Sequence, residues 1–264
     1  MNEYLKTNRD LWDKWTGIHV ESEFYDVPGF KAGKCSLLDI EVTEMGEVTG
    51  KSLLHLQCHF GQDTLSWARR GATVTGVDFS TKAIAQAKTL ASECNLDARF
   101  ICCNLYELPK HLDETFDIVF TSAGVLLWLP DLHQWAQLIR RYLKPGGMFY
   151  IREFHPFACM MDTDKPEPTE PYFKVGHPQK WTLEGSYANP DADIKADSYD
   201  WPVAMGEIVT ELINAGLQIE FLHEFDYSQC QLMSYLKQSD DGQWRYNDLP
   251  GGLPLMFSIR AIKN

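Results

Sequence analysis

The sequence predicts an α/β fold with a doubly wound sheet, because short apolar stretches alternate with amphipathic ones along the chain. The clearest evidence lies between Leu53 and Asp78. This segment contains an apolar run, a tight turn that includes Gly61, a short helical pattern and a second apolar run that ends in the acid. The order is typical of a βαβ unit whose first strand leads a ligand to the N-terminus of a helix.

We expect helices and strands at regular intervals around this unit. Apolar residues of 3–15 share one helical face, and Ser36 with Asp39 three residues later favours a second helix. Ser80 is a suitable cap for a helix with a continuous apolar stripe, and Asn95 should end that helix. The other expected helices are 62–70, 132–143 and 205–215, and the expected strands are 52–56, 72–77, 99–102, 116–121, 148–153, 217–223 and 255–262.

Two long segments interrupt this alternation. Residues 156–203 carry seven prolines and several aromatic residues with little periodicity, and 226–252 is similarly irregular. A long insertion of this kind is typical of a lid or of disorder, and the aromatic residues favour the lid. We therefore predict one domain over 1–264, with a cover helix and loop at 1–35, a lid at 156–203 and a flap at 226–252.

Composition limits the partners. The formal net charge is −13, so a polyanion such as DNA or RNA would be repelled, and small-molecule substrates are expected instead. Seven cysteines without C-x-x-C spacing suggest a reducing cytosol. The charged N-terminus lacks the apolar core of a signal peptide, and the apolar runs are too short to cross a bilayer. We expect a cytoplasmic protein without membrane or nucleic-acid partners, as a monomer or homodimer.

The loop after the first strand and the acid after the second predict the cofactor. The carboxylate of Asp78 can accept hydrogen bonds from both hydroxyls of a ribose, which indicates an adenosine-containing ligand. The bulky residues between Gln57 and Phe60 would obstruct the close approach of a pyrophosphate. S-adenosylmethionine fits best, and a dinucleotide-dependent oxidoreductase is the weaker alternative.

Four sequence motifs resemble those of the class I S-adenosylmethionine-dependent methyltransferases. They are LLHLQCHFG, GVDFS, FDIVFTS and LKPGGMFYIREFHP. The resemblance covers 36–155 strongly and 205–262 by pattern, and is closest to bacterial small-molecule methyltransferases with an LQCHFG loop. It implies a Rossmann-like methyltransferase fold, a seven-stranded, mostly parallel sheet with an antiparallel last strand.

The first motif departs from the usual pattern. The positions of its acid and three glycines are occupied by His55, Gln57, His59 and Gly61, so the backbone path around the methionine part of the cofactor can differ. His55 and His59 are four residues apart but do not share a helix, so we predict no metal site. Cys58 is expected to be an inert thiol.

The ends of the strands supply the expected cofactor contacts. Asn104 occupies the position at which similar methyltransferases bind the adenine amino group, although an ordinary turn residue is the alternative. The expected cofactor-binding residues are Gln57, Cys58, His59, Gly61, Asp78, Phe79, Ser80, Asn104, Leu105, Thr121 and Ser122.

Glu153 and His155 follow the fifth strand of the sheet and are the expected catalytic residues. His155 suits a general base because its ordinary pKa is near neutrality, and Glu153 could orient it or bind a cationic acceptor. The alternative is that both only hold the lid by hydrogen bonds.

The sequence therefore predicts methyl transfer to an O or N atom of a small acceptor. The irregular first motif leaves open a non-catalytic protein that binds the cofactor as a sensor or partner subunit. Trp12 or Trp15 could lie near the sulfonium, or simply dock the N-terminal helix.

Overall fold

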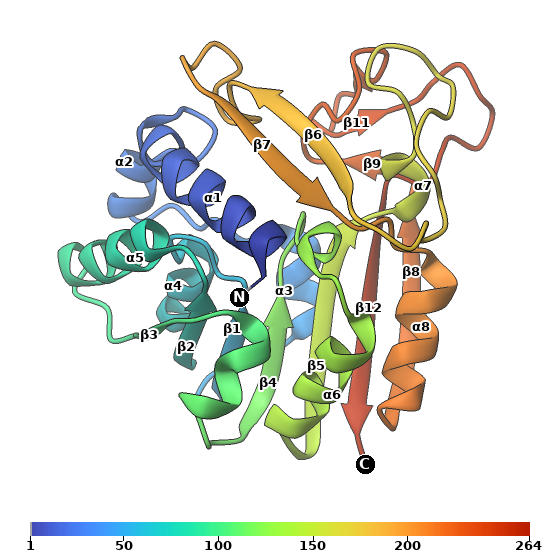
Figure 1. The fold of residues 1–264 in the computed structure, drawn as a ribbon. Helices are drawn as coiled ribbons and strands as arrows, with labels where there is room; N and C mark the ends of the chain where they lie inside the picture. Colours follow the sequence, from blue (N-terminus) through green and yellow to red (C-terminus); the bar gives the residue numbers. More distant parts are fainter. Residues whose placement is uncertain (1) are drawn as a thin grey trace.

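A seven-stranded sheet lies at the centre of the computed structural model, which describes residues 2–264 (Figure 1). The strand order is β3-β2-β1-β4-β5-β12-β8. These strands are β1 (Ser52–Leu56), β2 (Thr73–Asp78), β3 (Arg99–Cys102), β4 (Phe116–Thr121), β5 (Leu143–Phe154), β8 (Leu217–Phe225) and β12 (Met256–Lys263). Neighbours from β3 to β5 pair in parallel, whereas β12 is antiparallel to both β5 and β8. The predicted doubly wound fold with an antiparallel last strand is confirmed.

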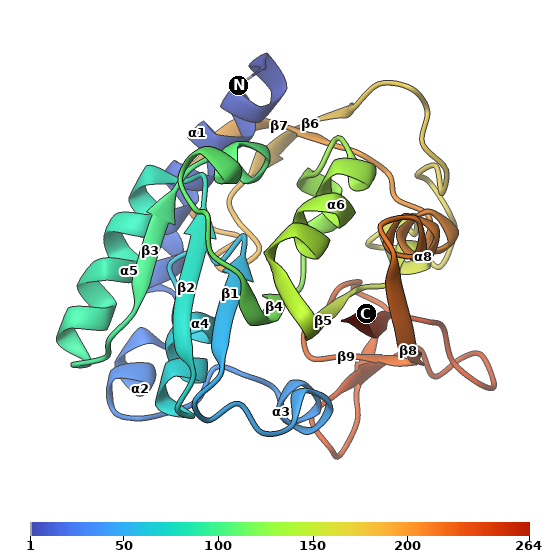
Figure 2. The same ribbon diagram turned by 90° about the horizontal axis from the view of Figure 1, so that it is seen from below.

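Helices cover both faces of this sheet (Figure 2). One face packs against η1 (Leu105–Lys110), α6 (Leu132–Tyr142) and α8 (Met205–Asn214), and the other against α3 (Asp39–Met45), α4 (Gln62–Arg69) and α5 (Thr81–Glu93). The strand residues explain this arrangement, because β1 and β4 are apolar on both faces and nearly all of their side chains are buried.

The register brings three strand ends together. Leu56, the last residue of β1, lies beside Val77 of β2 and Thr121 of β4. The turns that follow β1, β2 and β4 therefore meet at one edge of the sheet, where α/β folds bind their ligands.

Several element boundaries differ from the sequence prediction. The N-terminal helix α1 (Glu3–Glu21) is longer than 3–15, because Trp15, Thr16 and His19 continue its buried face. Ser36 does not cap a helix; its hydroxyl binds Asp63, and α3 begins at Asp39. A short helix, α2 (Val27–Lys31), was not expected, and β5 begins five residues earlier than predicted.

The two irregular segments contain regular structure. Within 156–203 lie α7 (Pro156–Cys159) and a hairpin formed by β6 (Gln179–Glu184) and β7 (Lys195–Asp200). Within 226–252 lie β9 (Tyr227–Ser228), β10 (Lys237–Gln238) and β11 (Trp244–Arg245), which form a small three-stranded sheet. Little of this was visible in the sequence because the strands are short and their neighbours are turns and prolines.

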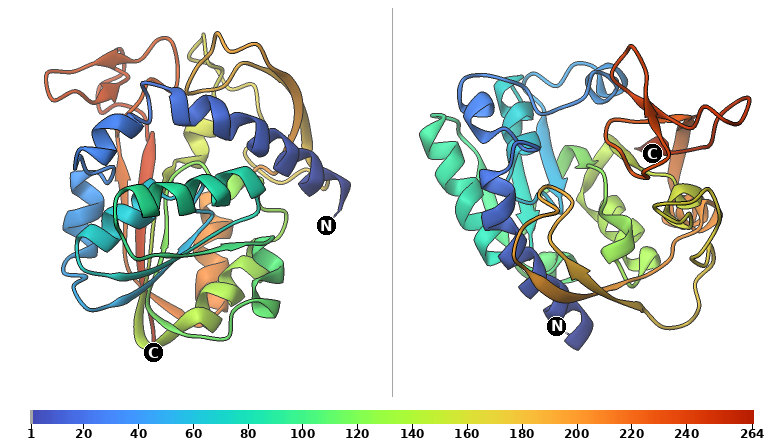
Figure 3. Two further views of the ribbon diagram at one scale, coloured as in Figure 1. Left: turned by 90° about the vertical axis from the view of Figure 1, so that its left-hand side faces the viewer. Right: turned by 90° about the horizontal axis from the view of Figure 1, so that it is seen from above.

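The N-terminal helix and the β6–β7 hairpin lie side by side above the carboxyl ends of the strands (Figures 1 and 3). The side chain of Asn8 joins them, since its amide accepts from the N–H of Tyr199 at 2.8 Å and donates to the same residue's carbonyl at 2.6 Å. The indole N–H of Trp15 donates to the carbonyl of Gly185 at 3.0 Å. One of the remaining short helices, η2 (Leu126–Trp128), follows β4. Within residues 2–264, no helix combines the length and the apolar character that a membrane crossing requires.

Gly76 in β2 is required by close packing behind the first loop. A Cβ at this position would lie 2.8 Å from the thiol of Cys58 and 2.8 Å from the ring of Phe100. We predict that Gly76→Ala lowers the free energy of unfolding by about 1–3 kcal/mol, as overpacked cores do.

Gly206 in α8 provides the matched control, because a Cβ there meets no atom within 4 Å among the described residues. Gly206→Ala should raise the free energy of unfolding by about 0.5–1 kcal/mol. Urea unfolding of both variants checks the pair, and equal effects would contradict the packing argument.

Candidate functional site

The loop after β1 follows an unusual backbone path. Gln57, His59 and Gly61 all have left-handed conformations, with φ of 57°, 50° and 82°. These are the three positions at which the resemblance implies glycine. A non-glycine residue in this conformation costs of order 1–3 kcal/mol, and such strain concentrates at functional sites. The loop therefore keeps alternating left-handed residues although two of its glycines are replaced.

Asp78 ties this loop to the start of α5. Its carboxylate accepts from the backbone N–H of His59 at 2.9 Å and from that of Ser80 at 2.8 Å. Burial raises the pKa of Asp78 to about 6, and the backbone N–H donors oppose that shift. Each carboxylate oxygen has two lone pairs, so the group keeps capacity for two further donors, as a ribose would supply.

The other predicted residues after β2 and β3 hold the local structure. The hydroxyl of Ser80 accepts from the N–H of Ala83, which confirms it as the cap of α5. Asn104 accepts from the N–H of Tyr106 and so begins η1, as its turn interpretation predicted. Leu105 is buried in the core and Phe79 is only partly buried.

Asp13 is a residue that the sequence reasoning missed. From α1 it accepts hydrogen bonds from Ser80 Oγ at 2.7 Å, Thr81 Oγ1 at 3.0 Å and the N–H of Lys82 at 3.0 Å. An acid at a helix N-terminus is favourable, so Asp13 anchors α1 beside Asp78. Nothing in the sequence spacing pointed to a contact over this distance along the chain.

Two further predicted residues lie at the ends of β1 and β4. The hydroxyl of Thr121 is buried and has no hydrogen-bond partner among residues 2–264. The amide of Gln57 donates to the carbonyl of Val125 at 3.1 Å, but its Oε1 likewise lacks a partner there. Unsatisfied buried oxygens are costly, and these two lie where β1 and β4 end.

His55 and Cys58 have side chains committed to the protein interior. The ring nitrogens of His55 lie 2.8 Å from Thr64 Oγ1 and 3.2 Å from Ser122 Oγ, and burial lowers its pKa to about 3. Ser122 is thus the hydrogen-bond partner of a buried histidine. Cys58 is buried among apolar residues, which raises its thiol pKa well above the usual value, so only its backbone can face a ligand.

Glu153 accepts four backbone hydrogen bonds. One oxygen accepts from the N–H groups of Gly124 and Phe154, and the other from those of Val125 at 2.8 Å and Leu126 at 3.1 Å. Burial raises the pKa of Glu153, and these donors oppose the shift. The carboxylate therefore fixes the turn that follows β4.

His155 has both ring nitrogens occupied. Its Nδ1 accepts from the N–H of Phe157 at 3.0 Å, so the proton is on Nε2, which donates to Glu224 at 2.9 Å. Neither nitrogen is free to take a proton from an acceptor. This geometry is that of the alternative role, in which Glu153 and His155 hold the segments above the sheet, and we assign no proton transfer to them.

An aromatic cluster covers the first loop. Trp12 contacts the rings of His59 and Trp128, with centroids 5.2 Å and 5.5 Å away. Tyr187, from the turn of the β6–β7 hairpin, contacts Trp15 at 5.8 Å. The cluster is Trp12, Trp15 and His19 of α1 with Tyr25, His59, Trp128 and Tyr187. It joins the turns after β1 and β4 to the elements above them.

Two histidines pair inside this cluster. His19 Nδ1 lies 2.9 Å from His59 Nε2, and the outer nitrogens, His19 Nε2 and His59 Nδ1, are buried without a partner among residues 2–264. Burial lowers the pKa of His19 to about 4, and burial together with His19 lowers that of His59 well below 6.5. Both imidazoles are therefore neutral at pH 7.

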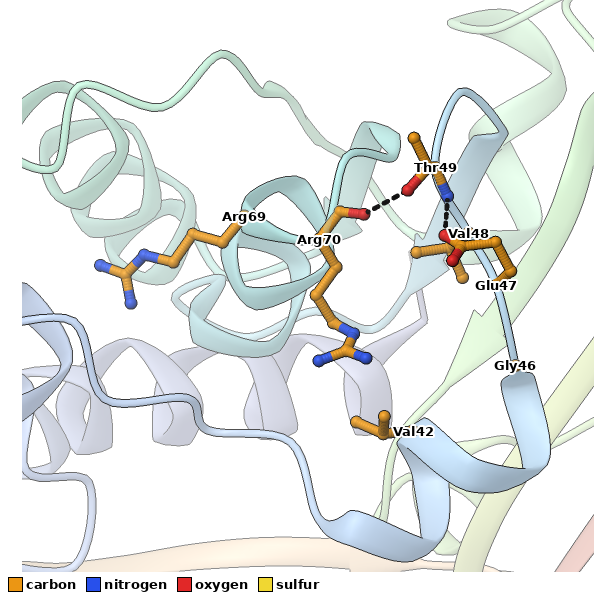
Figure 4. A pocket seen from close by; sticks show the side chains of 7 residues that line it. All are labelled: Val42, Gly46, Glu47, Val48, Thr49, Arg69 and Arg70. Atoms are coloured by element: carbon orange, nitrogen blue, oxygen red, sulfur yellow. Dashed lines mark hydrogen bonds between the residues drawn. The ribbon is translucent and has the colours of Figure 1, made fainter.

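A pocket lies at the opposite edge of the sheet, away from these residues. It has a volume of about 410 Å³ and is lined by Val42, Gly46, Glu47, Val48, Thr49, Arg69 and Arg70 (Figure 4). Its residues precede β1 or end α4, which places it at the amino edge of the sheet. The guanidinium of Arg69 already donates to the carbonyls of Phe30 and Lys34, so we assign no chemistry to this groove.

Comparisons with known proteins agree with the observed fold. Residues 54–151 match the model of the family described as Methyltransferase domain. The ubiquinone biosynthesis O-methyltransferase of Pseudomonas entomophila is 29% identical over 140 residues, which cover 53% of this chain and 56% of the relative. An uncharacterized methyltransferase of Synechocystis is 36% identical over 107 residues, 40% of this chain and 48% of the relative. The chain thus spans about half the length of these curated relatives.

Solved structures are similar over more of the chain. An S-adenosylmethionine-dependent methyltransferase from Mesorhizobium loti has a TM-score of 0.56 at 18% identity, covering 88% of this chain and 100% of that one. The glycopeptide N-methyltransferase MtfA, solved with S-adenosylmethionine, has a TM-score of 0.53 at 18% identity, covering 85% and 92%. The Rossmann-like methyltransferase fold is therefore confirmed, and the match over 54–151 lies on the strands that carry the predicted motifs.

The contacts of Asn8 allow a test of the α1–hairpin cover. We predict that Asn8→Ala speeds hydrogen exchange in Gln179–Asp200, because the variant loses both hydrogen bonds to Tyr199. Thr7→Ala is the control, since the Thr7 hydroxyl binds only within α1. Unchanged exchange of the hairpin in Asn8→Ala would show that these bonds do not hold the cover.

Glu153 provides a second test. Glu153→Gln should lower the free energy of unfolding by about 1.5–3 kcal/mol, because an amide has one oxygen where the carboxylate has two. Glu114→Gln, at an exposed ion pair with Arg99, should change it little. Thermal unfolding measures both, and equal stability of the two variants would contradict this role for Glu153.

Proposed function

We propose that this protein transfers the methyl group of S-adenosylmethionine to an O or N atom of a small-molecule acceptor. The observation that carries this proposal is the edge at which Asp78, the left-handed loop and unpartnered buried polar atoms occur together. The methyltransferase domain match lies over the same strands. An O-methyltransferase and an N-methyltransferase occur among the similar proteins, which supports either atom as acceptor.

The residues at this edge fit the cofactor. Asp78 would bind the ribose hydroxyls, Phe79 and Leu105 would flank the adenine, and Asn104 would lie at its amino group. The buried Oε1 of Gln57 and hydroxyl of Thr121 would receive the polar part of the methionine end. The bound cofactor supplies a methyl group on a positively charged sulfur, which is a good leaving group.

The elements above the sheet would exclude water from this site. We propose 1–35, 156–203 and 226–252 as covers, since α1 and the hairpin are tied by Asn8 and Trp15. A small cavity of about 40 Å³ remains between Leu127, Trp181 and Asp200. Water exclusion and alignment are the main requirements of a displacement at a methyl carbon.

The non-catalytic alternative makes a different prediction. A sensor would bind S-adenosylmethionine without releasing S-adenosylhomocysteine in the presence of small alcohols, acids and amines. The left-handed conformations at Gln57, His59 and Gly61 support the catalytic proposal, because this chain adopts at all three positions a backbone conformation that glycine favours.

The affinity for S-adenosylhomocysteine tests the role of Asp78. Asp78→Ala should weaken binding by about 1.5–3 kcal/mol, the range for hydrogen bonds to a charged group. Asp113→Ala is the control, because the side chain of Asp113 is 96% exposed and precedes β4, at the end of that strand opposite the candidate site. Calorimetry that shows no binding by the natural protein, or equal binding by Asp78→Ala, would refute the assignment.

The pH dependence of this affinity follows from the raised pKa of Asp78. Ribose hydroxyls donate to the ionised carboxylate, so the affinity should fall as pH drops below about 6 and the group takes up a proton. The pKa of Asp63 is also raised to about 6 by burial, so the dependence must disappear in Asp78→Ala to be assigned to Asp78. A constant affinity of the natural protein from pH 5 to 8 would contradict this.

A further inference from the structure

The paired histidines of the aromatic cluster are not explained by cofactor binding. We propose that His19 and His59 together accept the proton that the acceptor loses during methyl transfer, an inference that rests on the proposed function. His59 belongs to the loop after β1, and His19 belongs to α1 above it. Their ring nitrogens are 2.9 Å apart, and each ring keeps one buried nitrogen without a partner among residues 2–264.

The number of N–H groups and lone pairs on the two rings suits this role. Two neutral imidazoles carry two N–H groups and two lone pairs. Their mutual hydrogen bond uses one of each, so one outer nitrogen is a donor and the other is a bare acceptor. If the shared proton moves across the pair, these two roles exchange. The pair can therefore take up a proton at one outer nitrogen and release one at the other.

Aromatic side chains surround the pair. The rings that contact the pair are Trp12, Trp15, Tyr25, Phe60 and Tyr187. The hydroxyls of Tyr25 and Tyr187 bind each other, and Tyr187 Oη lies 3.5 Å from His19 Nδ1.

Charged groups lie only at the margin of the pair. Asp78 binds the backbone N–H of His59, and Asp13 of α1 binds the start of α5. Among residues 2–264, no ion pair involves His19 or His59, and burial favours their neutral forms. A neutral imidazole is the form that accepts a proton, and because burial disfavours the imidazolium, the pair passes the proton on and does not retain it.

The other candidate proton acceptors already use their nitrogen or oxygen atoms in hydrogen bonds. His155 uses both ring nitrogens, and the carboxylate of Glu153 accepts four backbone N–H groups. His55 is bonded at both nitrogens as well. The His19–His59 pair is thus the titratable group of this edge with unused buried nitrogens.

The step balances without another reactant. The acceptor's O or N atom forms a bond to the methyl carbon as the carbon–sulfur bond breaks, and its electron pair stays on sulfur. The proton of the acceptor passes to the bare outer nitrogen of the pair. The shared proton crosses the pair and a proton leaves from the other outer nitrogen to solvent, which gives methylated acceptor, S-adenosylhomocysteine, H⁺ and a neutral pair whose bare nitrogen is now on the other ring. The reverse exchange of protons with solvent between turnovers returns the pair to its starting form.

Two variants test the pair with little disturbance of the fold. His59→Asn suits the left-handed φ of 50°, which asparagine tolerates well, and His19→Gln keeps a polar side chain in α1. His133→Gln is the control, because this exposed histidine of α6 pairs with Glu211 on the sheet face covered by α6 and α8. Calorimetry should show S-adenosylhomocysteine binding by His19→Gln and His133→Gln within about threefold of the natural protein.

The activity readout uses S-adenosylhomocysteine release with the best acceptor from a screen of phenols, hydroxy acids and amines. His19→Gln and His59→Asn should each lower kcat by roughly 10²–10⁴, and the double variant should lose no more than the worse single one. At a pH above the acceptor's own pKa the loss should shrink. A folded His59→Asn protein with kcat within threefold of the natural protein and an unchanged pH profile would overturn the inference.

A second readout needs no turnover. In ¹⁵N NMR, the outer ring nitrogens of His19 and His59 should shift on saturation with S-adenosylhomocysteine, whereas those of His133 should not. Resonances of the pair that do not move would also overturn the inference. Failure of the natural protein to bind S-adenosylhomocysteine would instead refute the proposed function, so the two failures are distinguishable.

Discussion

The carboxylate of Asp78 is the interaction on which the candidate site depends. It joins the loop after β1 to the first turn of α5 through the N–H groups of His59 and Ser80. Left-handed residues at Gln57 and His59 each cost of order 1–3 kcal/mol, while a hydrogen bond to a charged group contributes about 1.5–3 kcal/mol. The two magnitudes are comparable, so the hydrogen bonds of Asp78 can offset the cost of the left-handed conformations at Gln57 and His59.

The contacts of α1 near Asp78 also bear on the proposed covering of the site. Asp13 binds the residues that follow Asp78, Trp12 packs on His59, and Asn8 and Trp15 hold the hairpin. One helix thus contacts both the loop after β1 and the β6–β7 hairpin.

The sequence predicted the sheet and the position of Asp78 at the end of β2 well, because both depend on local patterns. Apolar runs of five or six residues, helical stripes and the acid at the end of β2 are each visible within a few positions. The structure also confirmed Ser80 as a helix cap.

Contacts between distant segments were not predictable from these patterns. Asp13 meets Ser80 and His19 meets His59 only because α1 crosses the sheet edge, which no spacing encodes. His155 was a reasonable base by position, but its role depends on Glu224, which lies 69 residues further along the chain. The hairpin of 156–203 was hidden because β6 alternates partly buried and exposed residues and β7 has a single buried residue, Ser198, so neither strand has a strongly apolar face.

A crystal structure of the protein with S-adenosylhomocysteine tests the central claim most directly. Our account predicts electron density for the ribose at Asp78, with Gln57, His59 and Gly61 still left-handed and α1 closed over the ligand. Density for the ligand in the groove beside Arg69 and Arg70, or a loop that abandons its left-handed residues on binding, would contradict it.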